Sequence, residues 1–268
     1  MQGFLKRRIV ENRRSAIVRY VAGLSRRFLN AYHYTGEYAF ATNGEKFALS
    51  RFAQAHGSKA IIWDVGAHLG EYALEAHDVM PEARIVSFEI IPEIAAQLKT
   101  RITEDWFELH EIGLSNAMGN IEVSWNRKQD TTNAVVPFAY EHLDLSDVQR
   151  RQCPITTIDR LIAEGHPPPD VLKIDVEGHE AAVLNGAGKL LASDNAPTMI
   201  QFEYGGTWIP SSATLYAAQA CLEGFGYAVG RLYPDHVAFK RYSWQDEHFR
   251  MGNMIAARGA RLRKLLSN

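Results

Sequence analysis

The chain has 268 residues, of which 46% are hydrophobic and 22% are charged. This length suits one α/β domain with an appendage, and the composition excludes a disordered, collagen-like or membrane-bundle protein. The formal net charge of −2 is the sum of two regions of opposite charge. Residues 1–30 contain eight basic residues and one acidic residue, a net charge of +7, whereas the remainder has 21 basic and 30 acidic residues, a net charge of −9. An acidic main body does not attract phosphates, so no nucleic-acid partner is expected.

Residues 1–44 are predicted to form a basic helical extension. Apolar side chains between residues 9 and 29 recur at roughly helical spacing with arginines between them, which indicates a basic amphipathic helix. Two interpretations stay open: the helix packs on the main domain, or it makes peripheral contact with an anionic membrane or a protein partner. No apolar run is long enough to span a bilayer, and no secretory signal is recognised. With only Cys153 and Cys221, a cytoplasmic protein is expected, free or peripheral at the inner face of the membrane.

Residues 45–268 are predicted to form an α/β domain with a mostly parallel sheet. A helix is expected from Glu45 to Ala55, and compact apolar runs then alternate with helical segments, which is typical of βαβ units. The runs expected as strands are residues 60–63, 84–88, 107–112, 171–174 and 199–202.

Two further regions depart from this simple alternation. Extended patterns at 120–125 and 151–158 predict an inserted hairpin or lid within residues 116–158. Short apolar segments at 226–229 and 252–256 predict an antiparallel pair that closes the sheet.

Candidate ligand-binding residues follow the first two strands, because ligands bind at the carboxyl ends of parallel strands. The segment from Asp64 to Gly70 contains Gly66 and Gly70, which allow a tight turn before a helix expected at 71–79. It lacks the third glycine of a dinucleotide fingerprint and the Lys-Ser/Thr of a phosphate-binding loop. The turn therefore favours a nucleotide-like ligand without a pyrophosphate at this point, and Glu89, at the end of the second strand, is placed to accept both ribose hydroxyls.

Acidic side chains follow the fourth and fifth strands. Asp175 and Glu177 are two residues apart in extended chain and share a face, with His179 close behind. This arrangement suits a general base with a raised pKa or an oxygen-ligand site for a divalent cation. Glu203 and Trp208 are candidates for an acceptor pocket, and Asp175 with Glu203 is the metal pair if a cation is used. No His-x-x-x-His spacing occurs, so no histidine metal site is expected.

These motifs resemble the FkbM family of S-adenosylmethionine-dependent methyltransferases, over about Glu45 to Ala256. The segments that carry the similarity are Asp64 to Tyr72, Phe88-Glu89, Gly113-Leu114-Ser115 and, most specifically, Lys173-Ile174-Asp175-Val176-Glu177-Gly178-His179-Glu180. The resemblance implies a seven-stranded Rossmann-like sheet and O-methylation of a hydroxyl on a sugar, glycan or related natural product. The sequence departs from the family at His68, Ile91 and His179, where Asn, Pro and a small residue are usual.

The resemblance also implies S-adenosylmethionine as the donor, with its methionine part at the glycine turn, its ribose on Glu89 and its adenine near Ser115. The expected donor-binding residues are Asp64, Gly66, His68, Gly70, Tyr72, Glu89, Ser115 and Asp175, and the expected catalytic residues are Asp175, Glu177, His179 and Glu203. Two other functions stay open. One is a non-catalytic adaptor that docks through the N-terminal helix, and the other is an NAD-dependent oxidoreductase, which shares the ribose carboxylate.

Overall fold

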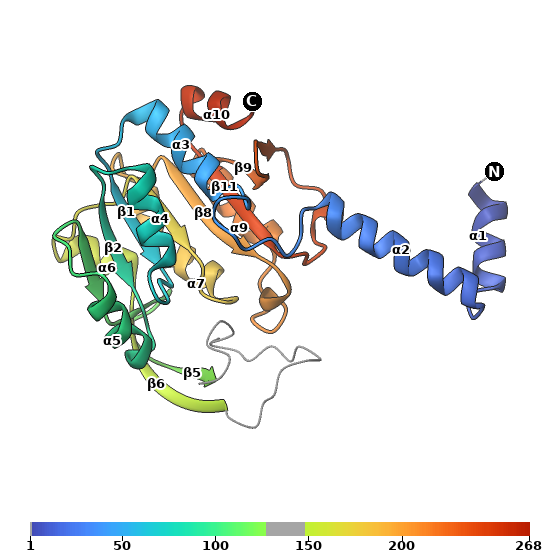
Figure 1. Cartoon of the computed structure of the whole chain (residues 1–268), viewed down its shortest axis with the longest axis horizontal. Helices are drawn as coiled ribbons and strands as arrows, with labels where there is room; N and C mark the ends of the chain where they lie inside the picture. The colour runs from blue at the N-terminus through green and yellow to red at the C-terminus, as the bar shows by residue number, and fades with distance from the viewer. Residues whose placement is uncertain (1, 127–147) are drawn as a thin grey trace. The chain divides into compact units, whose positions relative to one another are not determined.

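The computed structural model describes residues 2–126 and 148–268, and the chain divides into two compact units, Met1–Glu37 and Tyr38–Asn268. The first unit consists of α1 (Gln2–Glu11) and α2 (Ala16–Tyr32) (Figure 1). The extension is thus two helices rather than one, because Ser15 caps α2 by accepting a hydrogen bond from the backbone N–H of Val18 at 3.3 Å. Within α2 no side chain is buried. No helix in the described ranges combines the length and apolar character needed to cross a membrane.

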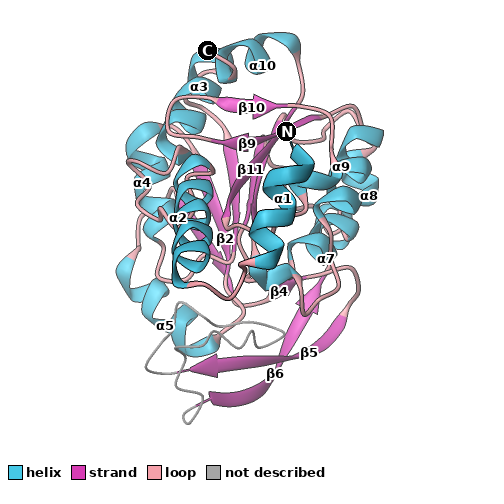
Figure 2. Ribbon diagram, turned by 90° about the vertical axis from the view of Figure 1, so that its right-hand side faces the viewer, coloured by secondary structure: helices cyan, strands magenta, loops and turns pink. Residues whose placement is uncertain are grey.

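The second unit is built on an eight-stranded sheet with the order β10-β9-β11-β8-β7-β1-β2-β3 (Figure 2). The strands are β1 (Ile61–Val65), β2 (Arg84–Phe88), β3 (Phe107–His110), β7 (Val171–Ile174), β8 (Met199–Tyr204), β9 (Ala228–Leu232), β10 (Val237–Phe239) and β11 (Gly252–Ala257). Strands β8, β7, β1, β2 and β3 are parallel, and β11 is antiparallel to both β8 and β9. The chain runs outward in opposite directions from β1 and β7, so a ligand crevice is expected at their carboxyl ends.

The Rossmann-like α/β fold and its predicted strands are confirmed, including the closing antiparallel pair, but the expected number of seven strands is wrong. The additional strand is β10, which pairs antiparallel with β9 from Val237 to Phe239. It is three residues long and lies at the edge of the sheet, so it leaves little periodic pattern in the sequence.

Helices cover both faces of this sheet (Figure 2). Those on one face are α3 (Glu45–His56), α4 (Glu71–Val79), α5 (Pro92–Arg101) and α10 (Ala260–Leu266); those on the other are α6 (Ile158–Ala163), α7 (Glu180–Asn185), α8 (Gly188–Leu191) and α9 (Leu215–Gly224). Consecutive strand residues serve opposite cores: Ile62 packs with α3 and α4, whereas Trp63 packs with α6 and α7. Burial on both faces explains why these strands read as continuous apolar runs.

The predicted insertion contributes a second, three-stranded sheet with the order β4-β6-β5. Its strands are β4 (Gly113–Leu114), β5 (Gly119–Asn126) and β6 (Val148–Thr156), and β5 pairs antiparallel with β6 along its whole length. Val123 and Cys153 pack against Ile91 and Ile94 at the start of α5. The hairpin is therefore confirmed, whereas the rest of the predicted lid, residues 127–147, lies outside the described residues.

Candidate functional site

A cavity of about 240 Å³ opens at the carboxyl ends of β1, β2 and β7, where the topology predicts a ligand. Its lining includes these sequence-predicted residues: Gly66, His68, Glu89, Asp175, Glu177 and His179. Apolar side chains from the second sheet complete one end of it, among them Leu114, Val123 and Ile155. The cavity therefore has an apolar end beneath the hairpin and an acidic end beside Asp175.

The turn after β1 has to be glycine at Gly66. Its φ is +82°, and a Cβ built there would lie 1.8 Å from the backbone oxygen of Asp175, which is closer than any real contact. Because of this approach, the turn after β1 and the loop after β7 form one surface of the cavity. Gly70 caps α4 and Tyr72 is buried within it, so these two predicted donor residues lie behind the cavity lining.

Glu89 is held in a fixed orientation at the end of β2. Its Oε2 accepts a hydrogen bond from the backbone N–H of His68 at 2.9 Å, and its Oε1 accepts one from Ile91 at 2.8 Å. Burial raises the pKa of Glu89, and the two backbone hydrogen bonds oppose that shift. The carboxylate lines the cavity with both oxygens already oriented, which fits recognition of a diol.

Asp64 is buried beneath the cavity and does not line it. It is 0% exposed, and its Oδ1 lies 3.0 Å from Nζ of Lys173, which faces it across the β1·β7 pair. Burial alone would lower the pKa of Lys173, but the carboxylates of Asp64, Asp175 and Glu45 raise it above its ordinary value. Lys173 also donates to the carbonyl of Gly66 at 3.3 Å. This ion pair therefore supports the turn from below.

The loop after β7, residues 175–179, forms the acidic end of the cavity and is called the acidic loop below. Glu177 has a φ of +52°, unusual for a residue with a side chain, and Glu180 holds this loop by accepting hydrogen bonds from the backbone N–H groups of Val176 and Gly178 at 2.9 and 3.1 Å. Burial, with the nearby carboxylates of Asp175 and Glu180, raises the pKa of Glu177 to about 8. A carboxyl group with such a pKa can release and accept a proton near neutral pH.

Glu203, on β8, faces the same group of carboxylates without lining the cavity. Burial, and then the charges of Asp175 and Glu177, raise its pKa well above the ordinary value. Its buried Oε2 has no hydrogen-bond partner in the described ranges, so it retains an unused site for a hydroxyl donor.

Two aromatic residues, Trp208 and Tyr38, differ from what the sequence predicts for the acceptor pocket. Trp208 is 0% exposed and donates from Nε1 to the carbonyl of Glu203 at 3.1 Å, so it is a core residue rather than part of an acceptor pocket. Tyr38 is 70% exposed, and its pKa is raised first by partial burial and then by the charges of Glu203 and Glu177. Nothing in the sequence around Tyr38 marks it as a site residue, because it precedes every recognised motif.

His179 and Ser115 meet at the far side of the loop. Ser115 Oγ and His179 Nε2 are 2.8 Å apart, and Ser115 is buried beneath His179, which lines the cavity. Burial lowers the pKa of His179, so the neutral imidazole is the favoured form. Ser115 therefore positions His179 in this structure.

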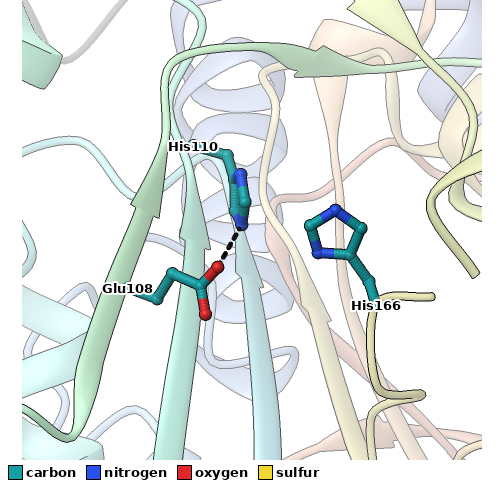
Figure 3. Close-up of side chains that lie close together, drawn as sticks. All are labelled: Glu108, His110 and His166. Carbon is teal, nitrogen blue, oxygen red and sulfur yellow. Dashed lines mark ion pairs between the residues drawn. The ribbon is translucent and has the colours of Figure 1, made fainter. Parts of the chain in front are cut away.

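Within the described residues, a cluster of three potential metal ligands lies outside the cavity lining. Glu108, His110 and His166 offer ligand atoms within 4.8 Å of one another (Figure 3). The prediction of no histidine metal site considered only spacing along the sequence, which does not show that His110 and His166 lie close together. They are far apart in the sequence and meet only through packing across the sheet.

Comparison with known proteins places the chain in a family. The model of the methyltransferase FkbM domain matches residues 64–229, which is more than half of the chain and contains the turn, Glu89 and the acidic loop. Among curated proteins, none matches the sequence.

Several solved structures are similar at low sequence identity. Methyltransferase FkbM from Methylobacillus flagellatus KT is 15% identical over 75% of this chain and 44% of its own, with a TM-score of 0.48. Precorrin-6y C5,15-methyltransferase from Geobacter metallireducens GS-15 is 16% identical over 80% and 86%, with a TM-score of 0.42. Human N-acetylserotonin methyltransferase in complex with SAM is 13% identical over 82% and 53%, with a TM-score of 0.37. The chain spans less than half the length of the first of these. On the family model that matches residues 64–229, the chain belongs to the methyltransferase FkbM domain family.

Proposed function

We propose that the chain is an S-adenosylmethionine-dependent O-methyltransferase that acts on a hydroxyl of a sugar, glycan or related natural product. The observation that carries this proposal is the cavity at the carboxyl ends of β1, β2 and β7, with a rigidly oriented Glu89 at one side and the acidic loop at the other. Family membership supports methyl transfer as the reaction. The acidic loop supports a hydroxyl as the acceptor, because a hydroxyl must lose a proton when it is methylated.

The cavity residues fit the donor group by group. The apolar end, with Leu114, Val123 and Ile155, would hold the adenine, and Glu89 would accept hydrogen bonds from the ribose hydroxyls. The turn at Gly66, where a Cβ would fill the available space, would lie against the methionine part together with Asp175. When bound, the donor would supply a methyl group on a cationic sulfur, and the sulfur would leave as a neutral thioether when the methyl carbon is transferred in line to an acceptor oxygen.

The chain's own contribution to the reaction is to align the acceptor and remove its proton. Glu177 is the proposed base, because it lines the cavity and its pKa of about 8 allows proton transfer near neutral pH. Glu203 would hold a second acceptor hydroxyl through its unpartnered Oε2, and Tyr38 would offer an aromatic face to a sugar ring. Asp175 and His179 border the same end of the cavity and would orient the reacting hydroxyl.

A divalent cation held by Asp175 and Glu203 is the metal-dependent form of this proposal. It would replace the base by lowering the pKa of a coordinated hydroxyl. The pKa of Glu203, raised first by burial and then by the charges of Asp175 and Glu177, opposes this form, because a carboxyl group that keeps its proton binds metal poorly and instead donates a hydrogen bond to a substrate oxygen.

The experiment that tests the function is incubation of the protein with S-adenosylmethionine and panels of nucleotide sugars, glycan fragments and polyketide alcohols. The expected result is a mass increase of one CH₂ unit in one acceptor class, before and after exhaustive chelation. Loss of activity on chelation would favour the metal-dependent form. Calorimetric titration with the donor and with NAD separates the alternatives: binding of neither indicates an adaptor, and binding of NAD alone indicates an oxidoreductase.

Glu89→Gln should weaken donor binding by roughly 10- to 100-fold, because an amide can accept a hydrogen bond through only one of its two terminal atoms. Binding is measured by calorimetry at a temperature where both proteins are folded. Glu75→Gln removes an exposed carboxylate from α4 and should bind the donor as the wild type does. Unchanged affinity in Glu89→Gln would remove Glu89 from the donor site.

We also propose that the N-terminal unit docks on an anionic membrane surface at the cytoplasmic side. In α2, Ile17, Val21, Leu24 and Phe28 follow one another at spacings of four, three and four residues, so they form a single stripe. All four are exposed. Arg19 and Arg26 lie on the opposite side of α2, Arg27 lies beside the stripe, and α2 contains no acidic residue. An apolar stripe flanked by cations fits the interface of a bilayer with anionic lipids.

This membrane proposal is tested by co-sedimentation with vesicles, a measurement that does not depend on methyl transfer. The full chain should bind phosphatidylglycerol-containing vesicles at least about tenfold more tightly than pure phosphatidylcholine vesicles, and added salt should weaken the binding. Leu24→Glu should lower this binding at least about tenfold, whereas Ile209→Glu, an equal charge change at an exposed position of the other unit, should not. Equal binding to both lipids, or a dimer that Leu24→Glu dissociates, would overturn the proposal.

A further inference from the structure

Three potential metal ligands meet at the edge of the large sheet, apart from the residues that line the donor cavity. Glu108 and His110 belong to the edge strand β3, and His166 belongs to the segment between α6 and β7 (Figure 3). His110 Nε2 lies 3.0 Å from Glu108 Oε1. The rings of His110 and His166 have centroids 4.9 Å apart and stand edge to face at 75°. Two imidazoles and a carboxylate are a donor set that borderline divalent ions such as Zn²⁺ prefer.

His110 is fixed by the sheet. It is two residues after Glu108 in β3, so both side chains leave the same face of the strand. Its ring stacks on Phe88 of β2 with centroids 5.1 Å apart. Its Nε2 is buried and makes no hydrogen bond of good geometry within the described ranges, although Glu108 is close. A buried imidazole nitrogen without such a bond is available as a ligand atom.

His166 is fixed by the end of α6. Gly165 takes a φ of +97°, its N–H donates to the carbonyl of Ile162, and the N–H of His166 donates to the carbonyl of Leu161, both at 3.1 Å. These two bonds define a Schellman motif, which requires a left-handed residue at the position of Gly165. Three prolines, residues 167–169, follow and restrict the chain further. The backbone that carries His166 is therefore set before any ligand binds.

The two carboxylate oxygens of Glu108 face different side chains. Arg84 donates a hydrogen bond to Oε2, which leaves Oε1 directed at His110. Burial opposes ionisation of Glu108, but the hydrogen bond from Arg84 and the nearby ring of His110 lower its pKa below the ordinary value. Burial lowers the pKa of His110, with the charge of Glu108 opposing and that of His166 adding to the shift.

We propose that Glu108, His110 and His166 bind one divalent transition-metal ion of the Zn²⁺ class. The ion joins edge strand β3 to the segment before β7, and Arg84 orients the carboxylate as an outer partner. The three side chains supply three protein ligands, and water completes the coordination. Because ligand atoms up to 4.8 Å apart move closer on coordination, binding should tighten the contact between these two segments.

The test is a calorimetric titration of the chelator-treated, tag-free full chain with ZnCl₂. Binding of one ion per chain is expected, with a higher thermal unfolding midpoint and, for CoCl₂, a visible absorption band. Glu108→Gln and His166→Ala should each weaken the affinity at least about tenfold. His236→Ala is the matched control, because His236 pairs with Asp235 at 2.8 Å on the exposed surface without a third ligand, and it should bind as the wild type does.

Two results would overturn the proposal: no saturable binding to the wild type, or equal affinity in the wild type and both variants. His166→Ala alters a partly buried side chain outside every helix and strand, so this variant tests the site even if Glu108→Gln weakens the sheet. The readouts are affinity, absorption and thermal stability, none of which requires that the chain transfers a methyl group.

Discussion

Glu177→Gln should slow methyl transfer about 100- to 10,000-fold while making the protein more stable above pH 8. The two effects have one cause. Glu177 is held among Asp175 and Glu180 in a partly buried loop, which raises its pKa from an ordinary 4.5 to about 8. Its ionised form is therefore the base that the proposed mechanism requires and also the form that the folded structure disfavours.

The sign of the stability effect follows from proton binding. Between about pH 4.5 and 8 the folded chain keeps a proton on Glu177 that the unfolded chain has lost, so the free energy of unfolding falls as pH rises through this window. Glutamine resembles the protonated form and removes this loss. After allowance for solvent screening of a partly exposed group, the gain should be about 1–3 kcal/mol at pH 9 and close to zero at pH 4.

This prediction is checked by measuring the rate of methyl transfer and the thermal unfolding of the wild type and the variant from pH 5 to 9. Wild-type kcat/KM should rise about tenfold per pH unit and level off above pH 8, and the residual activity of the variant should lack this step. Glu75→Gln, on the exposed side of α4, provides the control for loss of a carboxylate. If Glu177→Gln retained the wild-type rate, another group would be the base; if it lost stability at every pH, the side chain would have a structural role.

The cavity at the carboxyl ends of β1, β2 and β7 could be predicted from sequence because it follows from topology. Parallel strands read as apolar runs, and their carboxyl ends meet at one edge, so Gly66, Glu89 and Asp175 had to lie near one another. The glycine turn carries its own signal, since only glycine tolerates the approach of the backbone oxygen of Asp175.

Other parts depend on packing that no local pattern records. The pKa of Tyr38, which precedes the first motif, is raised in part by the charges of Glu203 and Glu177, and Trp208 is buried against Phe202 and Tyr204 although a double glycine precedes it. His110 of edge strand β3 and His166, which follows α6, meet through tertiary packing rather than through sequence spacing. The short edge strand β10 was missed for a similar reason, since its pairing with β9 defines it more than its own residues do.

The acidic side chains of the site divide into two classes according to whether they line the cavity. Asp64 pairs with Lys173, and Glu180 accepts hydrogen bonds from the backbone of the acidic loop, and neither lines the cavity, whereas Glu89, Asp175 and Glu177 do. The segment of residues 173–180 therefore combines Lys173, which supports the turn through its ion pair with Asp64 of β1, and side chains that line the cavity. This division predicts different consequences for substitution at neighbouring positions of one motif.

Lys173→Met should lower the free energy of unfolding by about 3–5 kcal/mol, because it leaves a buried carboxylate without its cation. Asp64 is 0% exposed and Lys173 is 5% exposed, with 3.0 Å between Nζ and Oδ1. Methionine preserves the length of the side chain, so the loss is mainly electrostatic. For a chain of this size the unfolding midpoint should fall by roughly 6–20 °C. The carbonyl of Gly66 also loses its donor, so donor affinity should fall as well.

The double variant Lys173→Met with Asp64→Asn separates charge from packing. Removing both charges leaves a polar amide in place of an unpaired carboxylate, so at least half of the lost stability should return. In the single variant, burial of Asp64 keeps its folded-state pKa above the ordinary value, so the deficit should shrink as pH falls towards 4 and the carboxyl group gains a proton. Lys189→Met, at an exposed position on α8, should leave stability within about 0.5 kcal/mol of the wild type. A deficit independent of pH and unrelieved in the double variant would show that Lys173 acts through packing against Tyr72, whose ring centre lies 5.2 Å from Nζ, rather than through Asp64.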